Sequence, residues 1–245
     1  MRKIAITNRK GGVAKTTTAV HVAAALSISD HNVLLIDTDT QGHCSLYFDE
    51  VPQYGLAEVI EEEIPAIQGV TEIWPGLSLM AGGRQLQGTS RLIAKESALK
   101  APHIMSQVLE PLDDAYDIVI IDTAPGFDDL TINVLVYADS LVVPVTMEAL
   151  AFAGLASFLE EVEAYGAYTD INVTHIVPTM YDRRVKQSEG LLEQLKGHFG
   201  PRVAPPIRYN VSLSEAPGFG KTVFTYDQKG RGSADYAHLA GMLAS

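Results

Sequence analysis

The chain has 245 residues, of which 47% are hydrophobic and 20% charged, and these proportions are typical of a soluble globular protein and exclude extended disorder. Its length suits one α/β domain with a well-buried core, and its single cysteine, Cys44, excludes an intramolecular disulfide framework and cannot by itself hold an iron–sulfur cluster or a structural zinc ion. The formal net charge of −12 disfavours diffuse attraction to DNA or to anionic lipid, although a local basic patch can still bind either.

Short apolar runs alternate with helix-like stretches along the chain. The first run, 3–7, is β-branched, and the Ala-rich segment 15–29 that follows has helical spacing. Further strands are predicted at 32–37, 77–82, 117–124, 140–146, 172–179 and 204–209. Further helices are predicted at 102–110, 128–137, 149–165, 186–198 and 233–244. Because the runs lack polar alternation, they are typical of parallel strands that helices cover on both faces. The sequence therefore predicts an α/β fold class, a doubly wound and mostly parallel sheet flanked by helices, in a single domain of residues 1–245 with its ligand site beyond the carboxyl ends of the strands.

The stretch KGGVAKTT, residues 10–17, lies between the first predicted strand and the first predicted helix, which is the context of a phosphate-binding loop. Its glycines allow backbone N–H groups to turn inward on phosphate oxygens, and the start of the helix adds partial positive charge. Lys15 supplies a point charge to the β- and γ-phosphates, and the Thr16 hydroxyl is placed to hold Mg²⁺. The pattern G-x-x-x-x-G-K-[ST] requires glycine at Arg9 and Ala14, so the loop is a variant.

Carboxylates end two of the predicted strands. Asp37 and Asp39 follow the run VLLI, and Asp122 follows IVII. Each could cap a following helix. Beside a phosphate loop, however, such carboxylates can face a metal–phosphate site directly or through water, because Mg²⁺ keeps several waters and takes few protein ligands. The sequence therefore predicts that Asp37 and Asp122 help to hold Mg²⁺.

The segment KGGVAKTTTAVHVAAAL resembles the deviant Walker A loop of the ParA/MinD ATPases, a branch of the SIMIBI P-loop proteins. In that family two subunits sandwich two nucleotides, and the first lysine of the loop reaches the phosphates bound by the partner. The resemblance implies that Lys10 acts across a homodimer, and that Asp39, in the pattern DTDTQ, positions the attacking water. It also implies that Asp122 has the Walker B role and that a switch segment begins at Pro125. Because the family usually has glycine at position 14, Ala14 is expected to reduce or alter turnover without abolishing binding.

The C-terminal half resembles the ParA/Soj branch in particular, in PTMYDRR (178–184) and in the segment 209–240 with its LSEAP motif. The resemblance places Asn210 against the nucleoside. Arg208 stands where the branch commonly has proline, and Tyr209 and Ser212 stand where it often has arginine; the second of these arginines is associated with non-specific DNA binding. Basic residues that could still form a DNA-binding patch are Arg183, Arg184, Lys186, Lys221, Lys229 and Arg231.

The expected site residues follow from these patterns and from the resemblance. The catalytic residues are Lys10, Lys15 and Asp39; the ATP-binding residues are Lys10, Gly11, Gly12, Val13, Ala14, Lys15, Thr16, Thr17 and Asn210; and the Mg²⁺ residues are Thr16, Asp37 and Asp122. The histidines at 21, 43 and 175 and the Cys44 thiol are expected to be structural.

The resemblance implies an ATP-hydrolysing switch for plasmid or chromosome partition, in which an ATP-sandwich dimer binds DNA non-specifically and a ParB-like partner resets it. A ParA-like ATPase that positions a protein cargo is the alternative, and a ligase of the dethiobiotin-synthetase kind is a third hypothesis. The last predicted helix has no Lys or Arg, which argues against a MinD-like membrane attachment. With no charged-then-apolar leader and no apolar run near the ~20 residues of a membrane span, a cytoplasmic protein that joins the nucleoid when ATP-bound is expected.

Overall fold

A seven-stranded sheet runs through the middle of the molecule in the computed structural model, which describes residues 1–148, 151–166, 169 and 171–244. In chain order the strands are β1 (Arg2–Ile6), β2 (Val33–Asp37), β3 (Thr71–Trp74), β4 (Leu77–Met80), β5 (Ile118–Asp122), β6 (Ser140–Thr146) and β7 (Asn172–Thr179). Their order in space is β3-β4-β2-β5-β1-β6-β7, and the pair β3–β4 is antiparallel while the other neighbours are parallel. The prediction of a doubly wound, mostly parallel sheet is confirmed.

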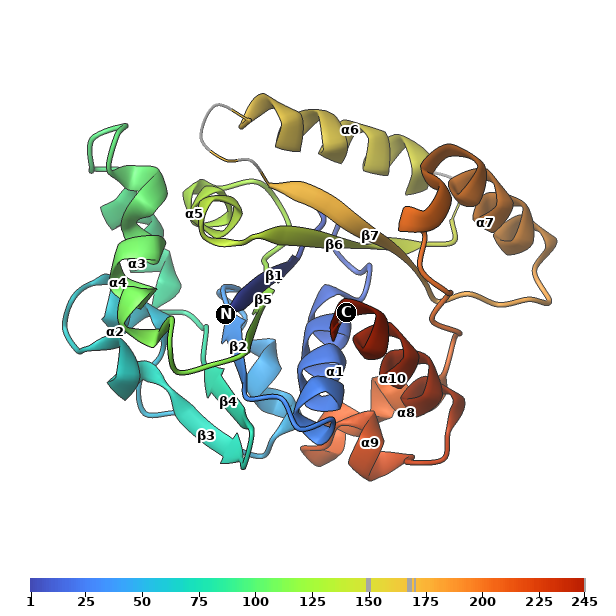
Figure 1. Ribbon diagram of the computed structural model, residues 1–245, viewed down its shortest axis with the longest axis horizontal. Helices are drawn as coiled ribbons and strands as arrows, with labels where there is room; N and C mark the ends of the chain where they lie inside the picture. Colours follow the sequence, from blue (N-terminus) through green and yellow to red (C-terminus); the bar gives the residue numbers. More distant parts are fainter. Residues whose placement is uncertain (149–150, 167–168, 170, 245) are drawn as a thin grey trace.

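Helices cover both faces of this sheet (Figure 1). They are α1 (Lys15–Ile28), α2 (Leu56–Ile60), α3 (Leu86–Ile93), α4 (Ile104–Leu109), α5 (Asp129–Tyr137), α6 (Ala151–Ala164), α7 (Lys186–Phe199), α8 (Val211–Glu215), α9 (Val223–Tyr226) and α10 (Arg231–Ala244). Helices α1 and α10 lie together on one face, and α2 to α7 contribute their apolar side chains to the other. Two short 3₁₀ segments, His43–Tyr47 and Ala216–Phe219, join these elements near the carboxyl ends of the strands.

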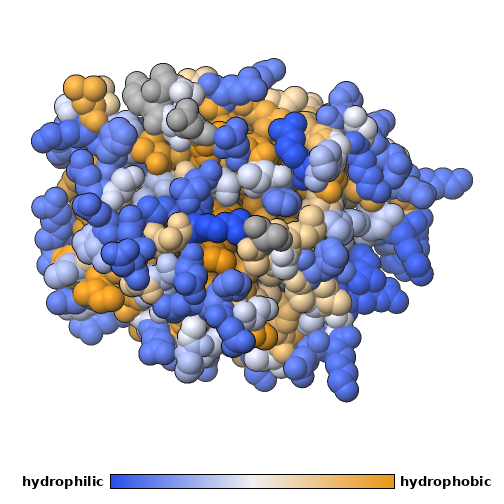
Figure 2. All heavy atoms as spheres, in the orientation of Figure 1, coloured by the Kyte–Doolittle hydropathy of each residue, from blue (hydrophilic) through white to orange (hydrophobic). Residues whose placement is uncertain are grey.

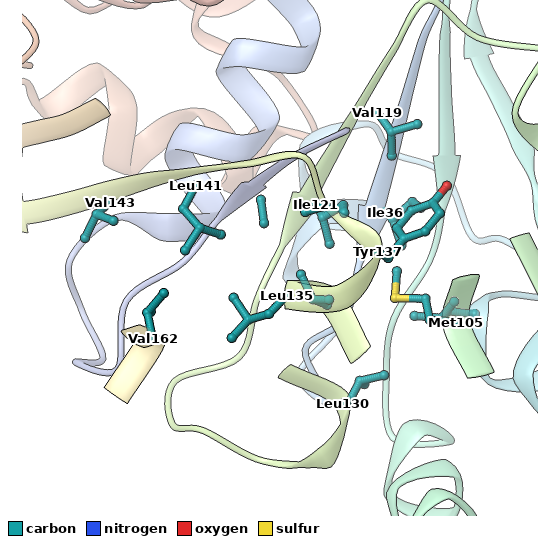
Figure 3. Close-up of a cluster of buried hydrophobic side chains, with 14 of the residues drawn as sticks. Ile36, Met105, Val119, Ile121, Leu130, Leu135, Tyr137, Leu141, Val143 and Val162 are labelled. Carbon is teal, nitrogen blue, oxygen red and sulfur yellow. The ribbon is translucent and has the colours of Figure 1, made fainter. Parts of the chain in front are cut away.

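The central strands are buried on both sides, which explains why their sequences show no polar alternation. In β5, Ile118 and Ile120 join the core beneath α1 and α10, whereas Val119 and Ile121 join the opposite core. Figure 3 shows the second of these cores, where Val119 and Ile121 lie near side chains from the surrounding helices, including Leu135. Because both faces of the sheet are buried, the ends of its strands are the parts that can present polar side chains to a ligand.

The fold differs from the sequence prediction at one predicted strand and at several short elements. The strand predicted at 204–209 is wrong: only isolated bridges form in and next to this segment, at Arg208 and Val203, because Pro205 and Pro206 have no N–H to donate to a ladder. The edge strand β3 and the short helices α2, α3, α8 and α9 were not predicted. The helix predicted at 149–165 is present as α6, and its first two positions lie outside the described residues.

Within the described part of the chain, no helix combines the length and the apolar character that a bilayer crossing requires. Figure 2 shows a face on which hydrophilic side chains predominate, with smaller hydrophobic areas between them.

Candidate nucleotide-binding site

The loop between β1 and α1 has the backbone shape of a phosphate cradle. Gly12 and Ala14 adopt left-handed conformations, with φ angles of 72° and 68°. Neighbouring polar groups hold the loop in place: Asn8 Nδ2 donates to Pro144 O at 2.8 Å, and Thr179 Oγ1 donates to Val13 O at 3.2 Å. This geometry lets successive N–H groups face one point ahead of the helix.

Lys15 is the first residue of α1 and is 7% exposed. Its Nζ donates to the Lys10 carbonyl at 3.1 Å, so the lysine folds back across its own loop. Burial lowers the pKa of Lys15, and the nearby carboxylates of Asp122 and Asp39 oppose that shift. The structure thus brings Lys15 together with two of the predicted carboxylates.

Asp37 and Asp122 are directly paired residues at the ends of the neighbouring strands β2 and β5, and both are buried. Asp37 accepts from the backbone N–H groups of Asp39, at 2.9 Å, and Cys44, at 3.0 Å. Burial raises the pKa of Asp37 to about 6, and burial together with the Asp37 charge raises the pKa of Asp122 well above its usual range. Because buried carboxylates need a cation or donors, this pair fits a hydrated Mg²⁺. Asp122 Oδ1 is buried without a hydrogen-bond partner among the described residues, and such an ion with its waters would satisfy it.

Asp39 lies on a tight loop after β2 and is 8% exposed. Its Oδ1 accepts from Gln41 N at 2.9 Å, and its carbonyl accepts from the N–H groups of Gly42 and Gly83, both at 3.0 Å. A Cβ on Gly82 would lie 2.6 Å from Asp39 O, so only glycine allows the chain after β4 to come this close. Sequence reasoning missed this support, although the Gly82–Gly83 pair at a strand end was its signal.

A cavity of about 260 Å³ opens beside the loop. Its lining residues are Ala14, Thr17, Thr179, Met180, Ile207, Arg208, Tyr209, Asn210, Leu213, Ser214 and Tyr236. Asn210 caps α8 by accepting from Ser212 N at 3.0 Å, and Arg208 is held at the rim by Asp235, with Nη2 and Oδ1 2.6 Å apart. The cavity is mostly apolar and adjoins the loop, so its position suits the base and ribose of a nucleotide.

His21 connects α1 to the C-terminal segment and is fully buried. Its Nδ1 lies 2.7 Å from Thr17 O, and its Nε2 accepts from Val223 N at 2.9 Å. Since Nε2 accepts, the ring is neutral with its proton on Nδ1, and burial lowers the pKa of His21 to about 4. Its predicted structural role agrees with these contacts.

The Lys10 side chain is exposed and pairs with an acidic residue outside its own loop. Its Nζ lies 2.6 Å from Glu148 Oε2, just after β6, and this contact lowers the pKa of Glu148. The neighbouring Arg9 pairs with Glu161 on α6. The two adjacent basic residues of the loop therefore have separate acidic partners.

Part of the predicted basic patch surrounds a second cavity of about 390 Å³, which shares Arg208 and Tyr209 with the first cavity. Its lining residues are Tyr181, Asp182, Arg183, Arg184, Arg208, Tyr209 and Arg231. Asp182 neutralises Arg184, with Oδ2 and Nη2 2.6 Å apart. Arg183 and Arg231 have no ion pair within the described residues, whereas Lys186, Lys221 and Lys229 are exposed outside this cavity.

Ala14 occupies the left-handed region that glycine adopts at no steric cost, and we expect Ala14→Gly to raise the free energy of unfolding by up to about 1.5 kcal/mol. The exchange removes roughly 1–2 kcal/mol of backbone strain from the folded state. It also lowers stability by roughly 0.5–1 kcal/mol, because glycine gives the unfolded chain more conformational entropy. Urea unfolding measures the difference. Ala25→Gly, in the interior of α1, is the control and should lower stability by at least about 0.5–1 kcal/mol. Equal losses in both variants would contradict the strain at Ala14. The altered turnover expected from Ala14 stays a prediction.

A parallel sheet, a left-handed loop leading into a helix that begins with lysine, and carboxylates on adjacent strand ends define a P-loop nucleotide-binding protein. A family model described as an AAA domain matches residues 1–174. Chromosome partitioning protein ParA of Caulobacter vibrioides (strain NA1000 / CB15N) is 35% identical over 255 residues, covering 100% of this chain and 94% of that protein. Chromosome-partitioning ATPase Soj of Thermus thermophilus is 36% identical over 244 residues, which cover 98% of this chain and 94% of that protein. The chain belongs to the ParA/Soj family of chromosome-partitioning ATPases.

Solved structures share the fold over the whole chain. Cobyrinic acid a,c-diamide synthase from Mycobacterium smegmatis, with bound ADP and magnesium, has a TM-score of 0.85 and 28% identity, covering 100% of this chain and 94% of that one. A putative plasmid partition protein from Borrelia burgdorferi, bound to AMPPNP, has a TM-score of 0.85 and 23% identity. The match covers 99% of this chain and 98% of that one.

Proposed function

We propose that this protein is an ATP-hydrolysing switch for plasmid or chromosome partition, built as a single domain of residues 1–245. The observation that carries the proposal is the convergence of Lys15, Asp39 and the Asp37–Asp122 pair at the mouth of the β1–α1 loop. Sequence identity of 35–36% to partition proteins over nearly the full length supports the same function.

ATP and Mg²⁺ are the proposed ligands. The phosphates would lie on the N–H groups of residues 10–17 with Lys15 beside them, and the nucleoside would enter the cavity that Asn210 lines. Thr16, Asp37 and Asp122 would hold the ion and its waters. Bound Mg²⁺ neutralises phosphate charge, while Asp39 orients the attacking water. The ADP–magnesium and AMPPNP complexes of the two structural relatives support this choice of ligand.

The proposed switch is a homodimer that forms around ATP. Lys10 is exposed, and Glu148 holds it outside its own phosphate loop, so its amino group is available to a second subunit once that ion pair opens. ATP binding would thereby be coupled to dimerisation, and a ParB-like partner would reset the dimer by stimulating hydrolysis.

The ATP-bound dimer would bind DNA non-specifically and so associate with the nucleoid. The side chains best suited to contact phosphates are Arg183 and Arg231, because Asp182 already neutralises Arg184 and Asp235 already neutralises Arg208. Because both arginines line the second cavity without an ion pair in the described part of the chain, the affinity for DNA should depend strongly on them.

A DNA-retention experiment with ATP, with ADP and without nucleotide tests this proposal. We expect retention with ATP only, and we expect Arg183→Ala to weaken it several-fold. If Arg183 neutralises one phosphate, the same variant should lower the slope of log affinity against log salt by about 1. Arg184→Ala is the matched control and should have a smaller effect. Equal effects of the two variants, or retention that ignores nucleotide, would count against the proposal.

A protein cargo in place of DNA is the second candidate, and the residue at position 212 favours it. Ser212 stands where the branch often has arginine, and its hydroxyl donates to Asp227 at 2.8 Å, so this position presents an acidic neighbour to any DNA. ATP-dependent dimerisation without DNA retention would select this candidate. A ligase function would require ATP turnover that depends on a small acid substrate.

A further inference from the structure

The Cys44 thiol lies beside the buried carboxylates of Asp37 and Asp122. Its Sγ donates to Asp122 Oδ2 at 3.6 Å, and its backbone N–H donates to Asp37 Oδ2 at 3.0 Å. One ligand atom from each of Asp37, Cys44 and Asp122 lies within 4.8 Å of the others, and all three side chains are at most 1% exposed. The 3₁₀ segment that starts at His43 places this thiol against the ends of β2 and β5.

A second observation, independent of the thiol, indicates an open acceptor at the same place. Asp122 Oδ1 is buried and lacks a hydrogen-bond partner within the described residues. Lys15 is near enough to lower the pKa of Asp122 by its charge, but its Nζ donates to the Lys10 carbonyl and not to this oxygen. A buried carboxylate oxygen without a donor is costly, and a cation relieves that cost.

We propose that Asp37, Cys44 and Asp122 form a binding site for a thiophilic divalent cation, with Zn²⁺ or Cd²⁺ as the ions of suitable chemistry. In a tetrahedral zinc site with Zn–S of about 2.3 Å and Zn–O of about 2.0 Å, the sulfur and oxygen lie about 3.5 Å apart. The observed Sγ–Oδ2 distance of 3.6 Å is therefore already that of one edge of such a site. Asp37 supplies the third ligand, and a water molecule completes the four.

The thiol determines which metals bind. Mg²⁺ takes oxygen ligands and gains nothing from sulfur, whereas zinc and cadmium bind thiolate strongly. When the metal–sulfur bond forms, the S–H bond breaks and its proton passes to solvent, with no change of oxidation state. If the proposed ATPase function is correct, a thiophilic ion at this site occupies the two carboxylates needed for Mg²⁺, so it inhibits hydrolysis.

Titration of the nucleotide-free full chain with Cd²⁺, followed by ultraviolet thiolate-to-metal charge-transfer absorption, tests the site directly. Cys44 is the single cysteine among the 245 residues, so the absorption can come from no other side chain and is distinct from metal binding by surface histidines. We expect one Cd²⁺ per chain in the natural protein and no absorption band in Cys44→Ser or Cys44→Ala. Absence of the band in the natural protein overturns the proposal, whether or not the variants fold.

Calorimetric titration with Zn²⁺ and with Mg²⁺ gives the selectivity. We expect the Zn²⁺ affinity of this site to fall by at least about 100-fold in Cys44→Ser, with little change for Mg²⁺. Circular dichroism confirms that the variant is folded. Equal Zn²⁺ affinity in both proteins would overturn the proposal. Inhibition of ATP hydrolysis by Zn²⁺ in excess Mg²⁺ is a separate measurement. The metal-binding result therefore stands even if the protein does not hydrolyse ATP.

Discussion

Asp39→Ala is expected to lower the rate of ATP hydrolysis by about 10²–10³-fold while ATP binding changes by less than about threefold. The expectation follows from position: the Asp39 carboxylate is close enough to Lys15 to affect its pKa, whereas the cavity that suits the nucleoside is lined by other residues. If Asp39 orients the attacking water as proposed, its loss should slow hydrolysis without removing contacts to the phosphates. Single-turnover hydrolysis and equilibrium binding of a fluorescent ATP analogue measure the two quantities.

Asp39→Asn is the matched variant, because an amide oxygen can still accept from Gln41 N and keep the loop after β2 in place. If the carboxylate acts on water, the asparagine variant should be nearly as slow as the alanine variant. Recovery of full activity by asparagine would show that Asp39 is only a loop-stabilising residue. A parallel loss of ATP binding would instead indicate that the phosphate loop depends on it.

The sequence was sufficient for the parts of the site that depend on strand order and on local backbone shape. Asp37 and Asp122 each end an apolar run, and parallel strands bring such ends to the same edge, where the structure pairs them. Gly12 and Lys15 needed only the strand and helix that flank their loop. For these residues the pattern and the contacts lead to the same arrangement.

The features that sequence reasoning missed depend on contacts between distant segments. Glu148 pairs with Lys10 across 138 positions, and Gly83 supports Asp39 from a strand end 44 residues further along the chain. The Cys44 thiol lies beside the two carboxylates because of the 3₁₀ turn that follows β2. No local pattern encodes such pairings, because they are selected by the packing of the whole sheet. The wrong strand at 204–209 has a local cause, since its apolar residues flank two prolines that cannot join a ladder.

Lys10→Ala is expected to abolish ATP-dependent dimerisation and to lower hydrolysis by about 10²-fold or more, while an isolated subunit still binds ATP. In the structure the Lys10 amino group contacts Glu148 and not its own loop, whereas Lys15 lies within the loop. Removing Lys10 should therefore leave nucleotide binding by one subunit nearly unchanged. Analytical ultracentrifugation with ATP and Mg²⁺ measures the dimer, and equilibrium binding at low protein concentration measures the monomer.

Arg9→Ala distinguishes a specific role of Lys10 from a general effect of basic charge on the loop. Arg9 is the adjacent residue, is exposed and has its own acidic partner, Glu161, so its loss changes the charge by the same amount. If the Arg9 variant dimerises normally and the Lys10 variant does not, the Lys10 side chain itself acts across the interface with the second subunit. If Lys10→Ala weakened ATP binding by monomers as much as it weakened dimerisation, Lys10 would act within its own subunit. In that case the Lys10–Glu148 ion pair would break in the monomer when ATP binds, without any contribution from a second subunit.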